Sequence, residues 1–253
     1  MNASMFRRLP NQHASASARM PDCRRALPCD RPQRDNYRSM NKCKTCKALI
    51  AGITLILAAM ALPILAGHLL CPAKNCVPGP FDLAGLMWAR QWHSTLLNSL
   101  FSGVTWLGSI MVLIPLALVM FWRQRQRPDG FFIPLALVGS MLISWVTKLW
   151  VARPRPALEA LIPLPADASF PSGHTLQATA FFLAWAMTCR WHPRYAPWLL
   201  ATAAIVLVGL SRIYLQVHFP TDVLFGAVTA ALWVTGLRLL MFPRPHANLW
   251  STH

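Results

Sequence analysis

The sequence predicts an all-α membrane protein in which six transmembrane helices form one bundle. Of the 253 residues, 55% are hydrophobic and only 13% are charged, whereas an average soluble domain carries about 25% charged residues. The formal net charge of +16 is unevenly spread, because residues 1–47 hold 11 of the 24 Lys and Arg. This composition excludes a disordered chain, which has fewer aliphatic residues, and a small secreted disulfide scaffold, which has more cysteine.

Six apolar segments have about the length needed to cross a membrane. A helix needs about 20 apolar residues to cross a hydrocarbon core of roughly 30 Å. Three segments meet this requirement outright and three more contain polar residues: 48–70, 96–122 and 131–151, then 172–189, 198–217 and 222–242. A further stretch, 81–94, is either an amphipathic helix in the membrane interface or an ordinary structured loop.

The two ends of the chain lie outside the predicted bundle of residues 48–242. Residues 1–47 contain no apolar run and many Arg, Ser, Pro and Asn, which predicts a disordered, solvated tail. Met40 opens a basic leader, MNKCKTCK, directly before the first span, so translation from Met40 is an alternative start. Residues 243–253 are expected to form a short cytoplasmic tail.

The basic residues of the short loops predict the orientation of the bundle. Lys and Arg are enriched in cytoplasmic loops, and if six spans alternate, most loop cations fall on one side: Lys42, Lys44, Lys47, Arg123, Arg125, Arg127, Arg190, Arg194 and Arg244. That side is therefore expected to be the cytoplasm. Cys71 and Cys76 fall on the other side, where disulfides can form, and the sequence leaves their pairing open.

Several ionisable residues lie inside or at the ends of the predicted spans, where each costs about 2.5–3.5 kcal/mol on insertion scales. The derived topology brings seven to the non-cytoplasmic face: Lys148, Arg153, Arg155, His174, Arg212, His218 and Asp222. Taken singly, a Lys or Arg can extend to the headgroups, and a histidine can serve in packing. Taken together they indicate a functional site, because no lipid-facing arrangement hides all seven.

These residues have the chemistry of a phosphate site. Lys148, Arg155 and Arg212 supply three positive charges, and Arg binds phosphate oxygens in a bidentate way. In the segment PSGH, Ser172 suits a helix N-cap and Gly173 lets backbone N–H groups approach an anion. The remaining groups, His174, His218 and Asp222, are an acid/base, a nucleophile and a carboxylate that orients it. No metal-ligand spacing accompanies them, so no metal or cofactor is expected.

The same residues resemble the signature of the type-2 phosphatidic acid phosphatase superfamily, which includes integral-membrane lipid phosphatases related to bacterial acid phosphatases and vanadium haloperoxidases. Its three parts occur in order as KLWVARPRP from Lys148, PSGH at 171–174 and SRIYLQVHFPTD at 211–222. The resemblance covers roughly residues 48–242. It implies that His218 forms a phosphohistidine, that Asp222 orients it, and that His174 protonates the leaving group and then activates water.

The duplicated Arg-Pro leaves two candidates for the motif arginine. The six-residue spacer after Lys148 selects Arg155, which makes Arg153 a residue of the rim that meets lipid headgroups. This choice predicts that Arg155→Ala abolishes turnover and that Arg153→Ala retains most of it. The resemblance also assigns phosphate binding to Lys148, Arg212, Ser172 and the Gly173 backbone N–H.

The leading functional hypothesis is a phosphatase acting on a lipid phosphate or diphosphate, with undecaprenyl diphosphate favoured among the lipids. Its active site would face the extracytoplasmic side of a bacterial inner membrane. The alternatives are a phosphotransferase using the same histidine and a non-catalytic transporter of anionic lipids. A soluble haloperoxidase is disfavoured by six spans, and no nucleic-acid partner is expected. The sequence leaves the oligomeric state open.

Overall fold

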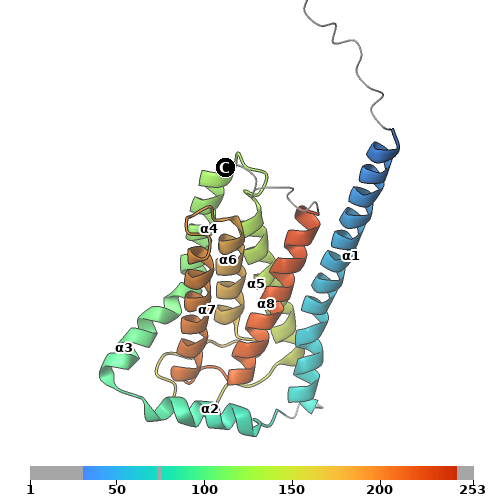
Figure 1. Cartoon of the computed structure of the whole chain (residues 1–253). Coiled ribbons are helices and arrows are strands. Elements are labelled where there is room, and N and C mark those ends of the chain that lie inside the picture. The colour runs from blue at the N-terminus through green and yellow to red at the C-terminus, as the bar shows by residue number, and fades with distance from the viewer. Residues whose placement is uncertain (1–30, 73–75, 244–253) are drawn as a thin grey trace, which may run out of the picture. The chain divides into compact units, whose positions relative to one another are not determined.

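The computed structural model describes residues 31–72 and 76–243, and every regular element in these ranges is a helix, which confirms the all-α prediction. The chain divides into two compact units, residues 1–40 and 41–253. The helices, shown in Figure 1, are α1 (Arg31–Leu70), α2 (Pro80–Gln91), α3 (Thr95–Val104), the 3₁₀ turn η2 (Thr105–Gly108), α4 (Ile110–Gln124), α5 (Phe132–Val151), α6 (Gly173–Thr188), α7 (Ala196–Tyr214) and α8 (Pro220–Met241).

The number of helices able to cross a membrane is four or five in the described residues, so the expectation of six is not confirmed. Residues Cys43–Leu70 and the helices α5, α7 and α8 have the necessary length and hydropathy. A fifth span is possible if the pair Thr95–Gly108 and Ile110–Gln124, which is bent by 45°, crosses as one unit. Helix α6 has only 16 residues.

The expected continuous helix over residues 96–122 is broken, and the break has a local cause. The chain tightens into η2, then becomes extended at Ser109, whose side chain accepts a hydrogen bond from the backbone N–H of Met111 and so restarts the helix as α4. Gly108 allows this break to pack closely on α6, because a Cβ there would lie 2.9 Å from the backbone oxygen of His174.

Helix α6 lies at the centre of the bundle and packs against α5, α7 and α8. Small side chains on α6 let its neighbours approach closely, and Ala180 and Ala184 are completely buried. They belong to the main apolar core together with Leu113 of α4, Phe132 of α5 and Val234 of α8. This packing fixes the start of α6 relative to the ends of its neighbours.

The structure on either side of the first span corrects one expectation and decides two alternatives. Helix α1 begins at Arg31, so residues 31–47, expected to be disordered, are helical, while residues 1–30 lie outside the described part. The tail after residue 243 also lies outside it. Cys71 and Cys76 form a disulfide. The stretch 81–94 contains the helix α2, which packs across the ends of α7 and α8 (Figure 1).

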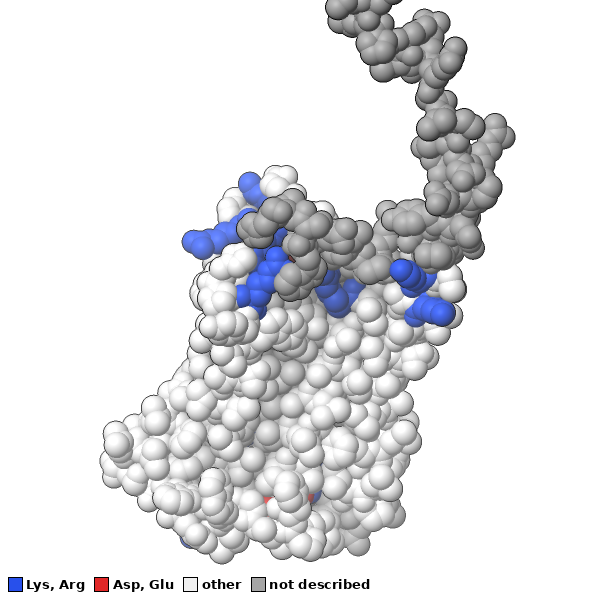
Figure 2. Space-filling view, in the orientation of Figure 1, with Lys and Arg blue, Asp and Glu red and all other residues white. Residues whose placement is uncertain are grey.

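The distribution of charge on the surface fits a protein surrounded by lipid. Figure 2 shows Lys and Arg gathered at the end of the bundle away from α2, with an almost uncharged surface between the two ends. Large apolar side chains are exposed along the helices, such as Leu57 of α1, Leu142 of α5 and Leu199 of α7. A surface of this kind is stable in hydrocarbon and not in water. The chain is a multi-pass membrane protein.

Candidate active site

The candidate residues come from four helix ends that meet at one end of the bundle, beside α2. Helices α5 and α7 finish there, and helices α6 and α8 begin there (Figure 1). This geometry brings together residues that are far apart in the sequence: Lys148 in the last turn of α5, Arg212 in the last turn of α7, His174 at the start of α6, His218 in the link before α8, and Asp222 in the first turn of α8.

His218 lies in the short link between α7 and α8 and is 1% exposed. Gln216 shapes this link by adopting a left-handed conformation with φ 60°, and its side chain donates to the backbone oxygen of Leu86 in α2. The Nε2 atom of His218 lies 3.2 Å from Nη1 of Arg155. Because arginine can only donate hydrogen bonds, Nε2 of the neutral imidazole is the unprotonated nitrogen, and Nδ1 carries the proton.

The Nδ1 side of His218 faces an acidic group. Asp222 Oδ2 lies 3.5 Å from Nδ1, and the hydroxyl of Ser169 lies 3.3 Å from the same atom while donating to Oδ2. Oδ2 also accepts the backbone N–H of Phe219. The carboxylate therefore orients the ring both directly and through Ser169, and leaves the lone pair of Nε2 directed toward Arg155.

The surroundings of His218 keep its imidazole neutral. Burial, together with the positive charges of Arg212, Arg155 and Lys148, lowers the pKa of His218 well below its ordinary value of 6.5. Each of these effects disfavours a second positive charge on the ring. A neutral imidazole with an unprotonated Nε2 is the form required of a nucleophile.

Lys148 and Arg155 form a cationic pair beside His218, and both hold Asp167. The side chain of Lys148 is 11% exposed and that of Arg155 is 8% exposed. Arg155 also donates to the backbone oxygen of Val217, next to the histidine. Of the two arginines in the duplicated motif, Arg155 is thus the one whose guanidinium contacts His218.

Arg153 does not lie at the rim, which corrects the sequence-based expectation. It is 1% exposed and makes ion pairs with two buried carboxylates, Asp82 of α2 at 2.7 Å and Asp222 at 2.6 Å. Its guanidinium also lies 4.1 Å from the centre of the Phe219 ring. The residue faces inward because the two carboxylates need a buried positive partner. Arg153 therefore holds Asp222 through Oδ1, whereas His218 faces Oδ2.

Arg212 approaches from α7 and is also buried. Its Nη1 donates to the hydroxyl of Thr105 in η2 at 2.6 Å. Its Nε is buried without a hydrogen-bond partner. An unpartnered guanidinium N–H in a buried cationic site has the capacity to bind an anionic ligand.

The PSGH segment, residues 171–174, leads into the start of α6 at the same end of the bundle as His218. The backbone N–H of Ser172 donates to the backbone oxygen of Asp222, which ties this segment to α8. The Ser172 side chain does not cap the helix as expected and instead accepts from the hydroxyl of Thr175. A Cβ at Gly173 would lie 3.9 Å from Cε of Lys148, so the start of α6 lies close to that lysine. His174, the next residue, is half-buried.

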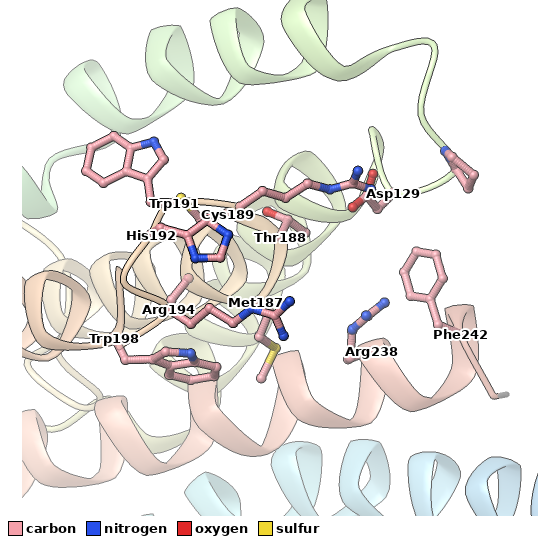
Figure 3. A pocket seen from close by; sticks show the side chains of 13 residues that line it. Asp129, Met187, Thr188, Cys189, Trp191, His192, Arg194, Trp198, Arg238 and Phe242 are labelled. Carbon is pink, nitrogen blue, oxygen red and sulfur yellow. The ribbon is translucent and has the colours of Figure 1, made fainter. Parts of the chain in front are cut away.

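A cavity lies at the other end of the bundle and does not belong to this site. Its volume is about 430 Å³. Figure 3 shows residues of the segment between α6 and α7, such as His192 and Arg194, on one side of it, and Arg238 of α8 on the other. None of the seven charged residues singled out from the sequence lines it.

Sequence reasoning missed three residues that complete the site. Ser169 precedes the PSGH segment by two positions, and Asp167 by four, but an isolated Ser or Asp in a loop carries no periodic or motif signal. Asp82 is the sole acidic residue of α2, and a single acidic residue in a mostly apolar interfacial segment is the signal that identifies it. Its partner is distant in sequence, so the pairing required the structure.

Comparison with known proteins finds related sequences. Residues 129–245 match the family model described as the PAP2 superfamily. The chain is 36% identical over 172 residues to phosphatidylglycerophosphatase B of Bacillus subtilis, covering 64% of this chain and 82% of that protein. It is 31% identical over 145 residues to undecaprenyl-diphosphatase BcrC of the same organism, covering 55% of this chain and 72% of that protein.

A solved structure is also similar over most of its length. The crystal structure of a transmembrane PAP2-type phosphatidylglycerolphosphate phosphatase from Bacillus subtilis superimposes with a TM-score of 0.61 and 28% sequence identity. The match covers 76% of this chain and 95% of that one.

Proposed function

Because the chain belongs to the PAP2 superfamily, we propose that it is a membrane-embedded phosphatase that hydrolyses a lipid phosphate or lipid diphosphate through a phosphohistidine. The observation that carries the proposal is the environment of His218. Its unprotonated Nε2 faces Arg155, and its protonated Nδ1 faces Asp222 and Ser169. An imidazole oriented in this way is prepared to attack phosphorus.

The proposed reaction has two steps. In the first, Nε2 of His218 forms a bond to phosphorus, the bond from phosphorus to the lipid oxygen breaks, and that oxygen takes a proton from His174. In the second, His174 removes a proton from water, the water oxygen bonds to phosphorus, and the bond from phosphorus to His218 breaks to release phosphate. Asp222 keeps the proton of His218 on Nδ1 throughout both steps.

The cations supply the electrostatic part of catalysis. Lys148, Arg155 and Arg212 would hold the phosphoryl oxygens, with the Gly173 backbone N–H as a further donor and Ser172 fixing the start of the helix. Preorganised donors of this kind are worth most in a buried site, where removing one commonly costs about 10²–10³ in kcat. A mechanism through histidine and fixed cations requires no divalent metal.

An apolar cavity of about 390 Å³ beside the site supports a lipid substrate over a soluble phosphate ester. It lies between α2, α3 and α7 and is lined by aromatic side chains, including Trp88, Phe101 and Tyr214. Pro220, two residues after His218, also lines it. Such a cavity suits the hydrocarbon chain of a substrate whose phosphate reaches the cations.

We place the active site on the extracytoplasmic side of the cell membrane. The basic loops that follow the positive-inside rule lie at the opposite end of the bundle (Figure 2). The Cys71–Cys76 disulfide, which persists in oxidising compartments, follows the first span at the histidine end. In this topology α6 is also a span, the fourth of six in chain order, and its short length is compensated because α5, α7 and α8 surround it.

The test is the release of phosphate by the purified protein in detergent. The substrates are phosphatidylglycerophosphate, undecaprenyl diphosphate, phosphatidic acid and lipid A, and the blank is His218→Ala. The matched control is His68→Ala, an exposed histidine of α1. We expect wild type and His68→Ala to release phosphate from at least one lipid at equal rates, and His218→Ala to release none.

Two results would contradict the proposal. One is phosphate release that survives in His218→Ala. The other is transfer of the phosphoryl group to a second lipid with no free phosphate, which would identify a phosphotransferase.

A further inference from the structure

Asp167 forms ion pairs with Lys148 and Arg155. In the proposed function these two cations bind the phosphate of the substrate. The Oδ2 atom of Asp167 lies 2.6 Å from Nζ of Lys148, and its Oδ1 atom lies 2.6 Å from Nη2 of Arg155. Each carboxylate oxygen is thus held by a different cation. Two adjacent oxygens of a phosphoryl group would bind the same pair in the same way.

Lys148 and Arg155 bind the backbone of this loop as well as the Asp167 side chain. The Nε atom of Arg155 donates to the backbone oxygen of Asp167 at 3.1 Å, and Lys148 donates to that of Ala168 at 2.8 Å. The Asp167 side chain is 53% exposed, whereas both cations are largely buried. The carboxylate therefore covers buried cations from the solvent side, where a ligand would enter.

The Asp167 carboxylate remains ionised at neutral pH. Its partial burial opposes ionisation, but the hydrogen bonds and positive charges of Lys148 and Arg155 outweigh this effect and lower the pKa of Asp167. A carboxylate with a lowered pKa is ionised throughout the neutral range.

We infer that Asp167 is an intramolecular competitor for the phosphate group, which a substrate must displace from Lys148 and Arg155. The inference rests on the proposed function. A competitor lowers the apparent affinity of every anion by the same factor, in proportion to the fraction of protein in which the cations are free. Weakly bound phosphodiester headgroups of the surrounding membrane are then kept off the cations, while a tightly bound phosphate monoester still enters.

The test compares Asp167→Asn with Glu159→Gln, which removes an exposed carboxylate from the same loop. Isothermal titration calorimetry with inorganic phosphate measures anion binding without turnover. We expect Asp167→Asn to bind phosphate roughly three- to tenfold more tightly than wild type. Phosphate release should show a fall in KM by the same factor with no rise in kcat, and Glu159→Gln should match wild type in both assays.

Unchanged or weaker phosphate binding in Asp167→Asn, at an unfolding temperature equal to that of wild type, would overturn the inference. If Asp167→Asn instead binds phosphate more tightly while no variant releases phosphate from a lipid, the competitor role stands and the proposed function fails. The two failures are therefore distinguishable.

An independent observation concerns the cavity of about 430 Å³ at the other end of the bundle. Its lining includes three arginines from two segments, Arg190 and Arg194 between α6 and α7, and Arg238 of α8. Arg194 and Arg238 are labelled in Figure 3. The single acidic residue in the lining, Asp129, already forms an ion pair with Arg127 at 3.3 Å. The lining therefore carries a net positive charge.

Aromatic side chains place this cavity at the level of a membrane surface. Trp191 and Trp198 line it, and the guanidinium of Arg238 lies 4.2 Å from the centre of the Phe242 ring. Tryptophan is enriched where the hydrocarbon meets the headgroups. Basic pockets between transmembrane helices bind the headgroups of anionic lipids.

We propose that this cavity binds the phosphate of an anionic lipid headgroup in the leaflet opposite the active site. The C-terminal residues 244–253 are a poorer occupant, because they contain Arg244 and no acidic residue and so do not complement the charge of the lining. A zwitterionic headgroup carries no net charge and gains less from three arginines.

The test is native mass spectrometry of the detergent-solubilised protein with phosphatidylglycerol, phosphatidylcholine or inorganic phosphate. The double variant Arg190→Gln/Arg238→Gln is compared with Arg123→Gln/Arg125→Gln, which removes the same charge from the same face outside the cavity. We expect binding of phosphatidylglycerol to be roughly thirtyfold weaker in the first double variant and unchanged in the second. Both double variants keep the active site intact, so any phosphatidylglycerol bound there contributes equally to the two measurements.

Equal loss in both double variants would show that net charge alone attracts the lipid and would overturn the proposal. Binding of phosphatidylcholine equal to that of phosphatidylglycerol, or full occupancy by inorganic phosphate alone, would also overturn it.

Discussion

Replacing Arg153 tests whether the buried ionic bridge behind Asp222 supports both folding and catalysis. Arg153→Ala leaves the carboxylates of Asp82 and Asp222, which are 1% and 0% exposed, without their shared positive partner. Removing one member of a buried ion pair typically costs about 3–5 kcal/mol. For a chain of this size that corresponds to a fall of about 10 °C in the unfolding temperature.

The same substitution should also alter the chemistry of His218, because Asp222 lies between them. Without Arg153, the negative charge of Asp222 is less neutralised and favours protonation of the imidazole. The acid limb of the profile of kcat/KM against pH should therefore move to higher pH. Arg153→Lys should recover only part of the loss, since one ammonium group lacks the planar fork that bridges two carboxylates.

The assays are thermal unfolding in detergent and phosphate release as a function of pH. The matched control is Arg90→Ala, an exposed arginine of α2, which should leave both unchanged. The reasoning is refuted if Arg153→Ala keeps the unfolding temperature and the pH profile of wild type, as would hold for an arginine that only meets headgroups.

The remaining predictions test the proposed site and the packing around it. Arg155→Ala should lower kcat/KM for phosphate release by at least about 10²-fold without a comparable loss of thermal stability, and a residual activity near wild type would contradict its role. Because the pKa of His218 is lowered, the acid limb of kcat/KM, which reports protonation of this nucleophile, should lie below pH 6.5. In Arg155→Ala, one of the charges that lowers this pKa is gone, so the acid limb should move to higher pH. Exhaustive chelation should leave phosphate release unchanged, whereas a retained magnesium requirement would argue against a phosphohistidine. Gly85→Ala places a Cβ 2.5 Å from Cγ of Pro220 and should destabilise the protein by about 1–3 kcal/mol, measured as a lower unfolding temperature.

The helical architecture and the residues of the three motifs could be read from the sequence, because both follow from short-range patterns. Hydropathy over about 20 residues identifies a membrane helix, and the spacing from Lys148 selected Arg155 over Arg153. The number of spans was less predictable. Whether α3 and α4 form one helix depends on the packing of Gly108 against His174, and residues 31–47 are helical despite their polar composition.

By itself, the sequence determined that cations, two histidines and a carboxylate meet at one end of a helical bundle, since loop charge and span length decide which end each residue reaches. Tertiary structure alone decided what each of these groups contacts. It turned Arg153 inward to Asp82 and Asp222, inserted Ser169 beside His218, and set Asp167 on Lys148 and Arg155. The physical reason is that the partner of a buried charge is chosen by proximity in space, and proximity between α2, α5 and α8 is created only when the helices pack.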